Sequence, residues 1–185
     1  PNVLPIALDT PDALDHTLAM AEQWGADIVV TIGGASVGDH DLVAPALDRF
    51  GVTRSFHKIA MRPGKPLMAG AKGDTTFLGL PGNPVSAIVC GHLFLLPMVR
   101  RALGQQDVLP VARNASLSAP LSAGGPRAHY MRAHFDEADE GRIVTAFDKQ
   151  DSSMLTVLAD ANCLLLRPIG DPPKAAGDRV TIYPI

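Results

Sequence analysis

A short polar stretch, residues 80–86 (LPGNPVS), lies between an expected strand and an expected helix and contains the residue types that bind anions. Asn83 can cap the helix with its side-chain oxygen, and Pro84 suits the first helical position because its missing N–H would be unpaired there. Gly82 lets the backbone turn sharply and approach a ligand closely. Because free N–H groups at the start of a helix attract phosphate, Gly82, Asn83 and Ser86 are predicted to bind substrate. Pro81 and Pro84, which have no N–H to donate, are counted among the substrate-binding residues because they would hold the loop rigid against the substrate.

A second glycine-rich loop, residues 33–41 (GGASVGDHD), follows the expected strand at residues 27–32. Its glycines expose backbone N–H groups to an oxyanion, which makes four residues candidate substrate ligands: Gly33, Gly34, Ser36 and Gly38. Two alternatives stay open. The loop is an ordinary strand-to-helix turn, or Ser36 within G-x-S-x-G is a hydrolase nucleophile whose base is His57, His92, His129 or His134. The intervening residues 39–41 and the extra glycine disfavour the hydrolase.

Asp41 ends this loop, directly before an expected helix. An aspartate in this position commonly caps the helix. A carboxylate beside a phosphate-binding loop is also how proteins hold Mg²⁺ with few ligands, so Asp41 is a candidate metal ligand. The two roles are compatible.

Three cations, Lys58, Arg62 and Lys65, surround a Pro-Gly turn in an otherwise acidic chain. A turn that folds them onto one side would direct them at an anion, and this is the role predicted for them. Arg132 gives a weaker signal, since it shares a face of an expected strand with two further side chains, Tyr130 and His134.

The composition favours a packed domain. The 185 residues are 46% hydrophobic and 19% charged, and the net charge of −3 disfavours a nucleic-acid binder driven by bulk charge. No apolar run approaches the roughly 18 residues of a membrane span, and no signal peptide opens the sequence. Cys90 and Cys163 occur in apolar contexts and are expected to be buried thiols, which favours a reducing, cytoplasmic setting.

Residues 1–104 alternate strands and helices, which predicts an α/β domain with a doubly wound, mostly parallel sheet and helices on both faces. The expected strands are residues 3–8, 27–32, 55–60, 66–69 and 76–80. The expected helices are one from Pro11 capped by Thr10, residues 42–50 closed by Gly51, and residues 85–103. Open α/β sheets bind ligands at the carboxyl ends of their strands, where both loops and the cationic turn fall.

Residues 105–185 have the pattern of a small, β-barrel-like second domain. Strands are expected at residues 128–135, 142–147, 163–167 and 179–183, with one short helix at residues 152–159. A doubly wound domain opens with an earlier strand than the one that follows residue 1. We therefore expect the chain to be a C-terminal segment of a longer protein.

Three motifs together resemble one family. D-x-V-V-x-x-G-G-x-S-V-G-x-x-D stands at residues 27–41, K-x-A-x-[KR]-P-G-K-P at residues 58–66, and G-L-P-G-N-P-V-S at residues 79–86. Their order and spacing resemble molybdopterin molybdenumtransferase, whose eukaryotic counterpart is the E domain of gephyrin. Residues 176–180 (AGDRV) are similar to the end of that family's small C-terminal β domain, so the resemblance covers essentially the whole chain.

The resemblance implies a transferase that inserts molybdate into adenylated molybdopterin, with Mg²⁺-dependent hydrolysis of the adenylate and release of AMP. It implies a homodimer in the full-length protein and neither nucleic acid nor membrane as partner. The implied catalytic residues are Asp41, Lys58, Arg62 and Lys65, and the implied metal ligands are Asp41 and Asp9. Pro81 and Pro84 match two prolines of the family's active loop. Two polar positions of the C-terminal domain are matched by Arg132 and Ser152.

The chain departs from the family in two respects. Arg62 stands where the family often has lysine, and the flat arginine fork differs from a lysine point charge. The family's two N-terminal domains and its first strand with a T-G-D-E turn are absent, so we expect the isolated segment to be inactive. Two alternatives share the fold: a molybdopterin adenylyltransferase-like protein, which resembles only the α/β part, and a non-catalytic scaffold that binds partners as gephyrin does.

Overall fold

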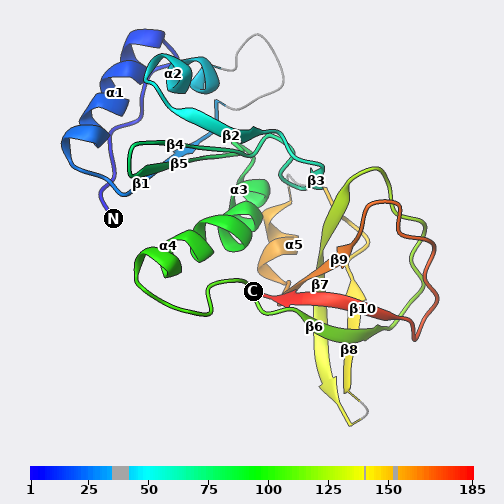
Figure 1. The fold of residues 1–185 in the computed structure, drawn as a ribbon. Helices are drawn as coiled ribbons and strands as arrows, with labels where there is room; N and C mark the ends of the chain where they lie inside the picture. The colour runs from blue at the N-terminus through cyan, green and yellow to red at the C-terminus, as the bar shows by residue number, and fades with distance from the viewer. Residues whose placement is uncertain (35–41, 140, 152–153) are drawn as a thin grey trace. The chain divides into compact units, whose positions relative to one another are not determined.

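The computed structural model describes residues 1–34, 42–139, 141–151 and 154–185, which form two compact units (Figure 1). The first unit comprises Pro1–Ile59 and Gly64–Asn83, and the second comprises Ala60–Pro63 and Pro84–Ile185. Each unit has its own hydrophobic core. The short segment Ala60–Pro63 therefore belongs to a different unit from the residues on either side of it.

A four-stranded sheet in the order β1-β5-β4-β2 forms the centre of the first unit. Its strands are β1 (Ile28–Ile32), β5 (Thr75–Leu80), β4 (Met68–Lys72) and β2 (Thr53–His57). β1 and β5 run parallel, whereas β4 is antiparallel to both β5 and β2. The α/β class is confirmed. The sheet is mixed rather than mostly parallel, because a tight turn joins β4 directly to β5 and strands joined in this way run antiparallel.

The helices α1 (Pro11–Gln23) and α2 (Val43–Arg49) lie where the sequence predicts them. The Ala13 N–H donates to the side-chain oxygen of Thr10 at 3.3 Å, and Gly51 closes α2 with a φ of +85°. Both helices contribute to one core with the sheet, through side chains that include Leu18, Leu47 and Phe77. Within the first unit, the two helices therefore cover the same face of the sheet (Figure 1).

Residues 3–8 do not form the predicted strand. The side chains of Val3, Ile6 and Leu8 are 90%, 98% and 73% exposed. A strand needs a hydrogen-bonded neighbour, and β1, at the edge of the described sheet, pairs only with β5. An apolar pattern alone is thus insufficient to make these residues a strand.

A helix over Pro84–Ala102 in the second unit corresponds to the one predicted for residues 85–103. It consists of α3 (Pro84–Cys90), the π-helical turn η1 (Gly91–Leu95) and α4 (Leu96–Ala102). The wider turn comes just before Pro97, which has no N–H to donate and would clash in a regular α-helix.

This helix is long and apolar enough to cross a membrane, with a mean hydropathy of 1.4. The core helices of soluble proteins satisfy the same criteria. No such segment is predicted from the sequence. Glycine, serine and proline divide the sequence of this helix into short apolar runs, so no single run is long enough for a membrane span. The hydropathy averaged over the helix is nevertheless high.

The second unit contains the predicted barrel, in which five strands close in the order β7-β8-β6-β10-β9 and β9 pairs back onto β7. Their bounds are β6 (Arg113–Leu117), β7 (Ala128–Ala138), β8 (Gly141–Ala146), β9 (Cys163–Arg167) and β10 (Arg179–Pro184). Alternate side chains of these strands form the interior, including Ala133, Val144, Leu165 and Ile182.

Three further elements of the second unit, two strands and a helix, differ in whether the sequence predicts them. The strand β6 lies in a Ser-, Pro- and Gly-rich stretch and was not predicted. The two-residue strand β3 (Met61–Arg62), also not predicted, pairs in parallel with the start of β7. The helix α5 (Leu155–Ala159) falls within the predicted helix at residues 152–159, of which residues 152 and 153 lie outside the described part.

Candidate functional site

The two glycine-rich loops meet at the carboxyl ends of β1 and β5 in the first unit. The Gly33 N–H donates to the Leu80 carbonyl at 3.1 Å. A Cβ placed on Gly82 would lie only 3.2 Å from the Cα of Gly33, so a side chain there would push the two backbones apart. Gly33 and Gly34 have φ values of +86° and +68°, a left-handed conformation that favours glycine. Parallel pairing of β1 and β5 thus brings the start of the first loop, Gly33 and Gly34, next to Gly82 of the second loop. The sequence predicts both loops at these strand ends.

The remaining residues of the Leu80–Ser86 stretch start a helix. Pro81 is buried in the first unit. The helix begins at Pro84, so Asn83 occupies the predicted cap position. Ser86 lies in the first helical turn and is buried, with 6% exposure. Their binding of substrate stays a prediction.

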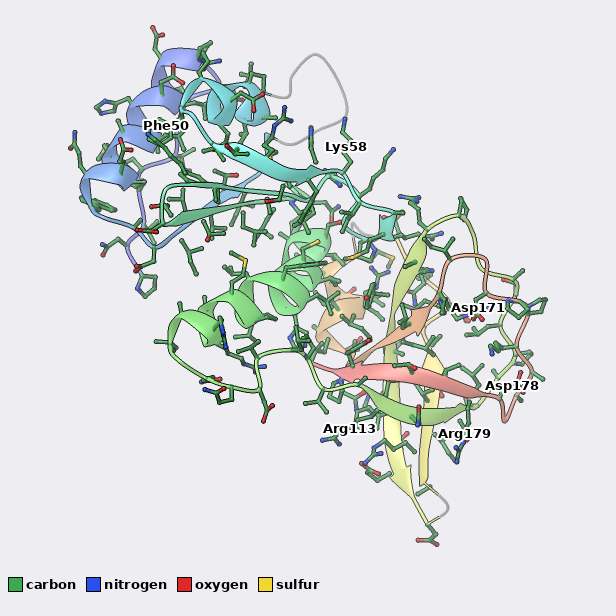
Figure 2. The ribbon with its side chains drawn as sticks, viewed as in Figure 1. Phe50, Lys58, Arg113, Asp171, Asp178 and Arg179 are labelled. Atoms are coloured by element: carbon green, nitrogen blue, oxygen red, sulfur yellow. The ribbon has the colours of Figure 1, made fainter. Side chains whose placement is uncertain are left out.

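The cationic turn places Lys58 and Lys65 in the first unit, both with exposed side chains. The Lys58 N–H donates to the Leu67 carbonyl and the Ile59 N–H to the Lys65 carbonyl, each at 3.0 Å. Lys58, which Figure 2 shows where β2 ends, has a φ of +69°. A lysine held in the left-handed region costs about 1–3 kcal/mol, and such residues cluster at functional sites.

Arg62, the third cation of this turn, lies instead on β3 of the second unit. It pairs in register with His129 of β7, and on the other side of β7 His129 pairs with Arg167 of β9. The three residues form one row across the sheet. This row lies two residues along β7 and β9 from the apolar pair Met131 and Leu165. Arg62 is thus assigned to a different unit from the two lysines, and its paired neighbour in the sheet is His129.

Arg132 is the most buried charged residue among those described, with 1% exposure. Its Nη2 donates to the carbonyls of Asp151 at 3.2 Å and Lys149 at 3.4 Å. The side chain of Gln150 bonds both the N–H and the carbonyl of Arg132, which fixes this part of β7. Its Nε is buried without a partner among the described residues. Burial lowers the pKa of the Arg132 guanidinium, with Asp151 raising it and Arg62 lowering it further.

His129 was named in the sequence analysis only as a possible base for Ser36, and the structure gives it a different setting. Burial, together with the positive charges of Arg62, Arg132, Arg127 and Arg167, lowers the pKa of His129 to about 4. The imidazole is therefore neutral near neutral pH. Sequence alone could not show this, because β3 and β9, which pair with β7, are distant from it along the chain.

The carboxylates assigned to a metal are only partly described. Asp9 is exposed, whereas Asp41 lies outside the described residues, as do Ser36, Gly38 and Ser152. Within the described ranges, no three His, Cys, Asp or Glu side chains gather as a metal site would require. The magnesium site stays a prediction.

Cys90 and Cys163 are buried free thiols, as predicted. Burial raises the pKa of each to about 12. Since the thiolate is the reactive form, neither cysteine has the properties of a nucleophile.

Two family models match the chain. Residues 2–101 match a family described as a probable molybdopterin binding domain, and residues 114–185 match the MoeA C-terminal region, domain IV. The first match alone extends over more than half of the 185 residues.

Curated relatives and a solved structure agree with these matches. A molybdopterin molybdenumtransferase of Haemophilus influenzae is 33% identical over 167 residues, which cover 89% of this chain and 41% of the relative. The protein of that name from Bacillus subtilis is 29% identical, over 92% of this chain and 40% of the relative. The solved molybdopterin biosynthesis MoeA protein of Pyrococcus horikosii is 26% identical with a TM-score of 0.75, over 96% of this chain and 42% of that protein. The chain thus spans about two fifths of the length of these proteins.

Proposed function

Since this chain belongs to the family of probable molybdopterin binding domains, we propose that it acts in molybdenum cofactor biosynthesis. It is the part of a molybdopterin molybdenumtransferase that binds adenylated molybdopterin and molybdate. The barrel's match to the MoeA C-terminal region supports this activity over that of an adenylyltransferase, which resembles only the α/β part. We further propose a cytoplasmic homodimer with domains at residues 1–104 and 105–185.

The close approach of Gly33 and Gly82 is the observation that carries the proposal. It brings two segments without side chains together at the carboxyl ends of a parallel strand pair, where the Gly33 N–H is itself bonded to the Leu80 carbonyl. Ligands of α/β sheets bind at this edge, and phosphate groups suit exposed backbone N–H groups there. The first unit therefore supplies a surface suited to the phosphates of an adenylated pterin, through Gly33, Gly34, Gly82 and the predicted ligands Ser36, Gly38, Pro81 and Asn83.

The cations suit the anionic substrates. Lys58 and Lys65, both exposed in the first unit, would neutralise phosphate charge as the adenylate is hydrolysed and AMP leaves. In the second unit, Arg62 and Arg132 offer donors to an oxyanion, the chemical form of both phosphate and molybdate. Such fixed charges act by positioning and electrostatic stabilisation, with little covalent work by the protein. Pro84, Ser86 and Ser152 complete the proposed substrate contacts.

Mg²⁺ fits the donor chemistry of Asp9 and Asp41, since hard carboxylate oxygens are its preferred protein ligands. Asp9 is exposed and accessible to such an ion. When bound, the ion would neutralise charge on the phosphates, and Asp41 would hold it next to the phosphate-binding loop.

The test is molybdate-dependent release of AMP from adenylated molybdopterin by the full-length protein. Lys58→Ala should lower the rate about 100-fold, the usual loss for one electrostatic group of an active site. Lys72→Ala is the matched control, because Lys72 forms an ion pair with Glu22 and lies outside the proposed contacts. No molybdate-dependent AMP release by the native protein would contradict the function. Full rates for both Lys58→Ala and Asp41→Ala would contradict the residue assignment alone.

A further inference from the structure

The charges around His129 are only partly compensated. Arg167 is paired with the Asp171 carboxylate, and Lys174 lies 3.9 Å from that carboxylate. Arg132 donates to backbone carbonyls, and Asp151 acts on it electrostatically. For Arg62 and Arg127, no ion pair is found within the described part of the chain. The surroundings of His129, from β3, β7, β9 and the loop after β9, are therefore net positive.

A half-buried histidine in a net positive environment remains neutral, first because burial disfavours the charged ring and second because protonation would add another like charge. An anion bound beside Arg62 opposes the second of these two effects. Two negative charges near the imidazole favour its protonated form, and a protonated histidine then donates a further hydrogen bond to the anion.

We propose that His129 is the proton-accepting residue of an oxyanion site in the second unit, and that it takes up one proton from solvent when a tetrahedral dianion binds beside Arg62. The site rests on the proposed function, because one of its substrates, molybdate, is a tetrahedral dianion and the other, adenylated molybdopterin, contains phosphate groups. Two further observations support it. Arg132, which is within electrostatic range of both Arg62 and His129, has a buried Nε donor without a described partner. His129 lies directly between Arg62 and Arg167 in the strand register.

Proton uptake makes anion binding depend on pH. A site that gains one proton on binding gains affinity as the pH falls, by up to about tenfold per pH unit, between the pKa of His129 in the complex and that in the free protein. A site that binds through arginines alone has no such dependence, because arginine stays charged throughout this range. The slope of affinity against pH therefore separates the two kinds of site.

The experiment is isothermal titration calorimetry of the full-length protein near pH 6, with molybdate and with methyl phosphate as separate probes. Repeating each titration in two buffers of different ionisation enthalpy gives the number of protons taken up. The native protein is compared with His129→Gln, because the difference removes any proton exchanged by the anion itself. His134→Gln is the matched control, since His134 is an exposed histidine of the same strand.

We expect the native protein and His134→Gln to take up about one proton more than His129→Gln, with at least one of the two anions. The anion that shows this difference identifies whether the site receives molybdate or a phosphate group. Equal uptake in native protein and His129→Gln overturns the inference, and so does a failure of both anions to bind. Either result leaves the proposed function standing if molybdate-dependent AMP release persists.

A measurement on the native protein avoids any effect of the substitution on folding. In a proton NMR titration of the histidine rings, one ring should titrate with a pKa of about 4 in the absence of the anion, and its pKa should shift to about 6 or higher when the anion is present. No histidine shifting in this way would also overturn the inference.

Discussion

Replacing Gly34 by alanine should destabilise the first unit by about 2–5 kcal/mol. Gly34 has a φ of +68°, and a residue with a Cβ pays about 1–2 kcal/mol in the left-handed region. The added Cβ would also lie 2.3 Å from Cγ2 of Val43, the first residue of α2. Val43 is 8% exposed and packs in the core, so it has little room to move. Forcing an extra methyl group into a packed site costs a further amount of about 1–3 kcal/mol.

The control for this prediction is Gly73→Ala. Gly73 has a φ of +56°, and nothing lies within 4 Å of a Cβ placed there, so only the backbone cost of about 1–2 kcal/mol applies. In a Val43→Ala background, the cost of Gly34→Ala should fall to the same value, because the clashing Cγ2 is gone. Trp24, the single tryptophan, lies in the first unit, so its fluorescence during urea unfolding reports on this unit. Equal costs for Gly34→Ala and Gly73→Ala would refute the contact with Val43.

Two further predictions concern buried groups. Asp171, the loop residue labelled in Figure 2, pairs with the buried Arg167, so Asp171→Ala should lower the free energy of unfolding in urea by about 3–5 kcal/mol. The control Asp15→Ala breaks an exposed pair with Arg49. This control should lower the free energy of unfolding by about 1 kcal/mol or less. Similar costs for both variants would contradict the buried pairing. Cys90 and Cys163, each with a pKa near 12, should resist iodoacetamide at mildly alkaline pH in the folded protein and react after unfolding in urea. Rapid labelling of either thiol before unfolding would contradict its burial.

Features set by a few neighbouring residues were predictable from the sequence. Thr10 caps α1, Gly51 closes α2, and Pro84 starts the long helix, since each acts within one helical turn. The meeting of the two glycine loops was also predictable, because the carboxyl ends of neighbouring parallel strands lie at one edge of a sheet. Here β1 and β5 are such neighbours, and Gly33 therefore contacts Gly82.

Features that depend on strand pairing over long stretches of sequence were not predictable. Residues 3–8 have the pattern of a strand but no described partner strand, so they remain irregular. The pairing of β3 with β7 is carried by two residues, Met61 and Arg62, too few for a periodic pattern. The sequence grouped Arg62 with Lys58 because they are close along the chain, whereas hydrogen bonding in the sheet groups it with His129.

A histidine at position 129 suits a site that is occupied only part of the time. A lysine there would add a permanent charge to the arginines and destabilise the free protein through like-charge repulsion. A carboxylate would pair with Arg62 and compete with the incoming anion for its donors. A neutral imidazole avoids both effects in the free state, and after protonation it adds attraction in the bound state. Asp171 and Asp151 compensate only part of the positive charge around His129, which leaves Arg62 available to an external oxyanion.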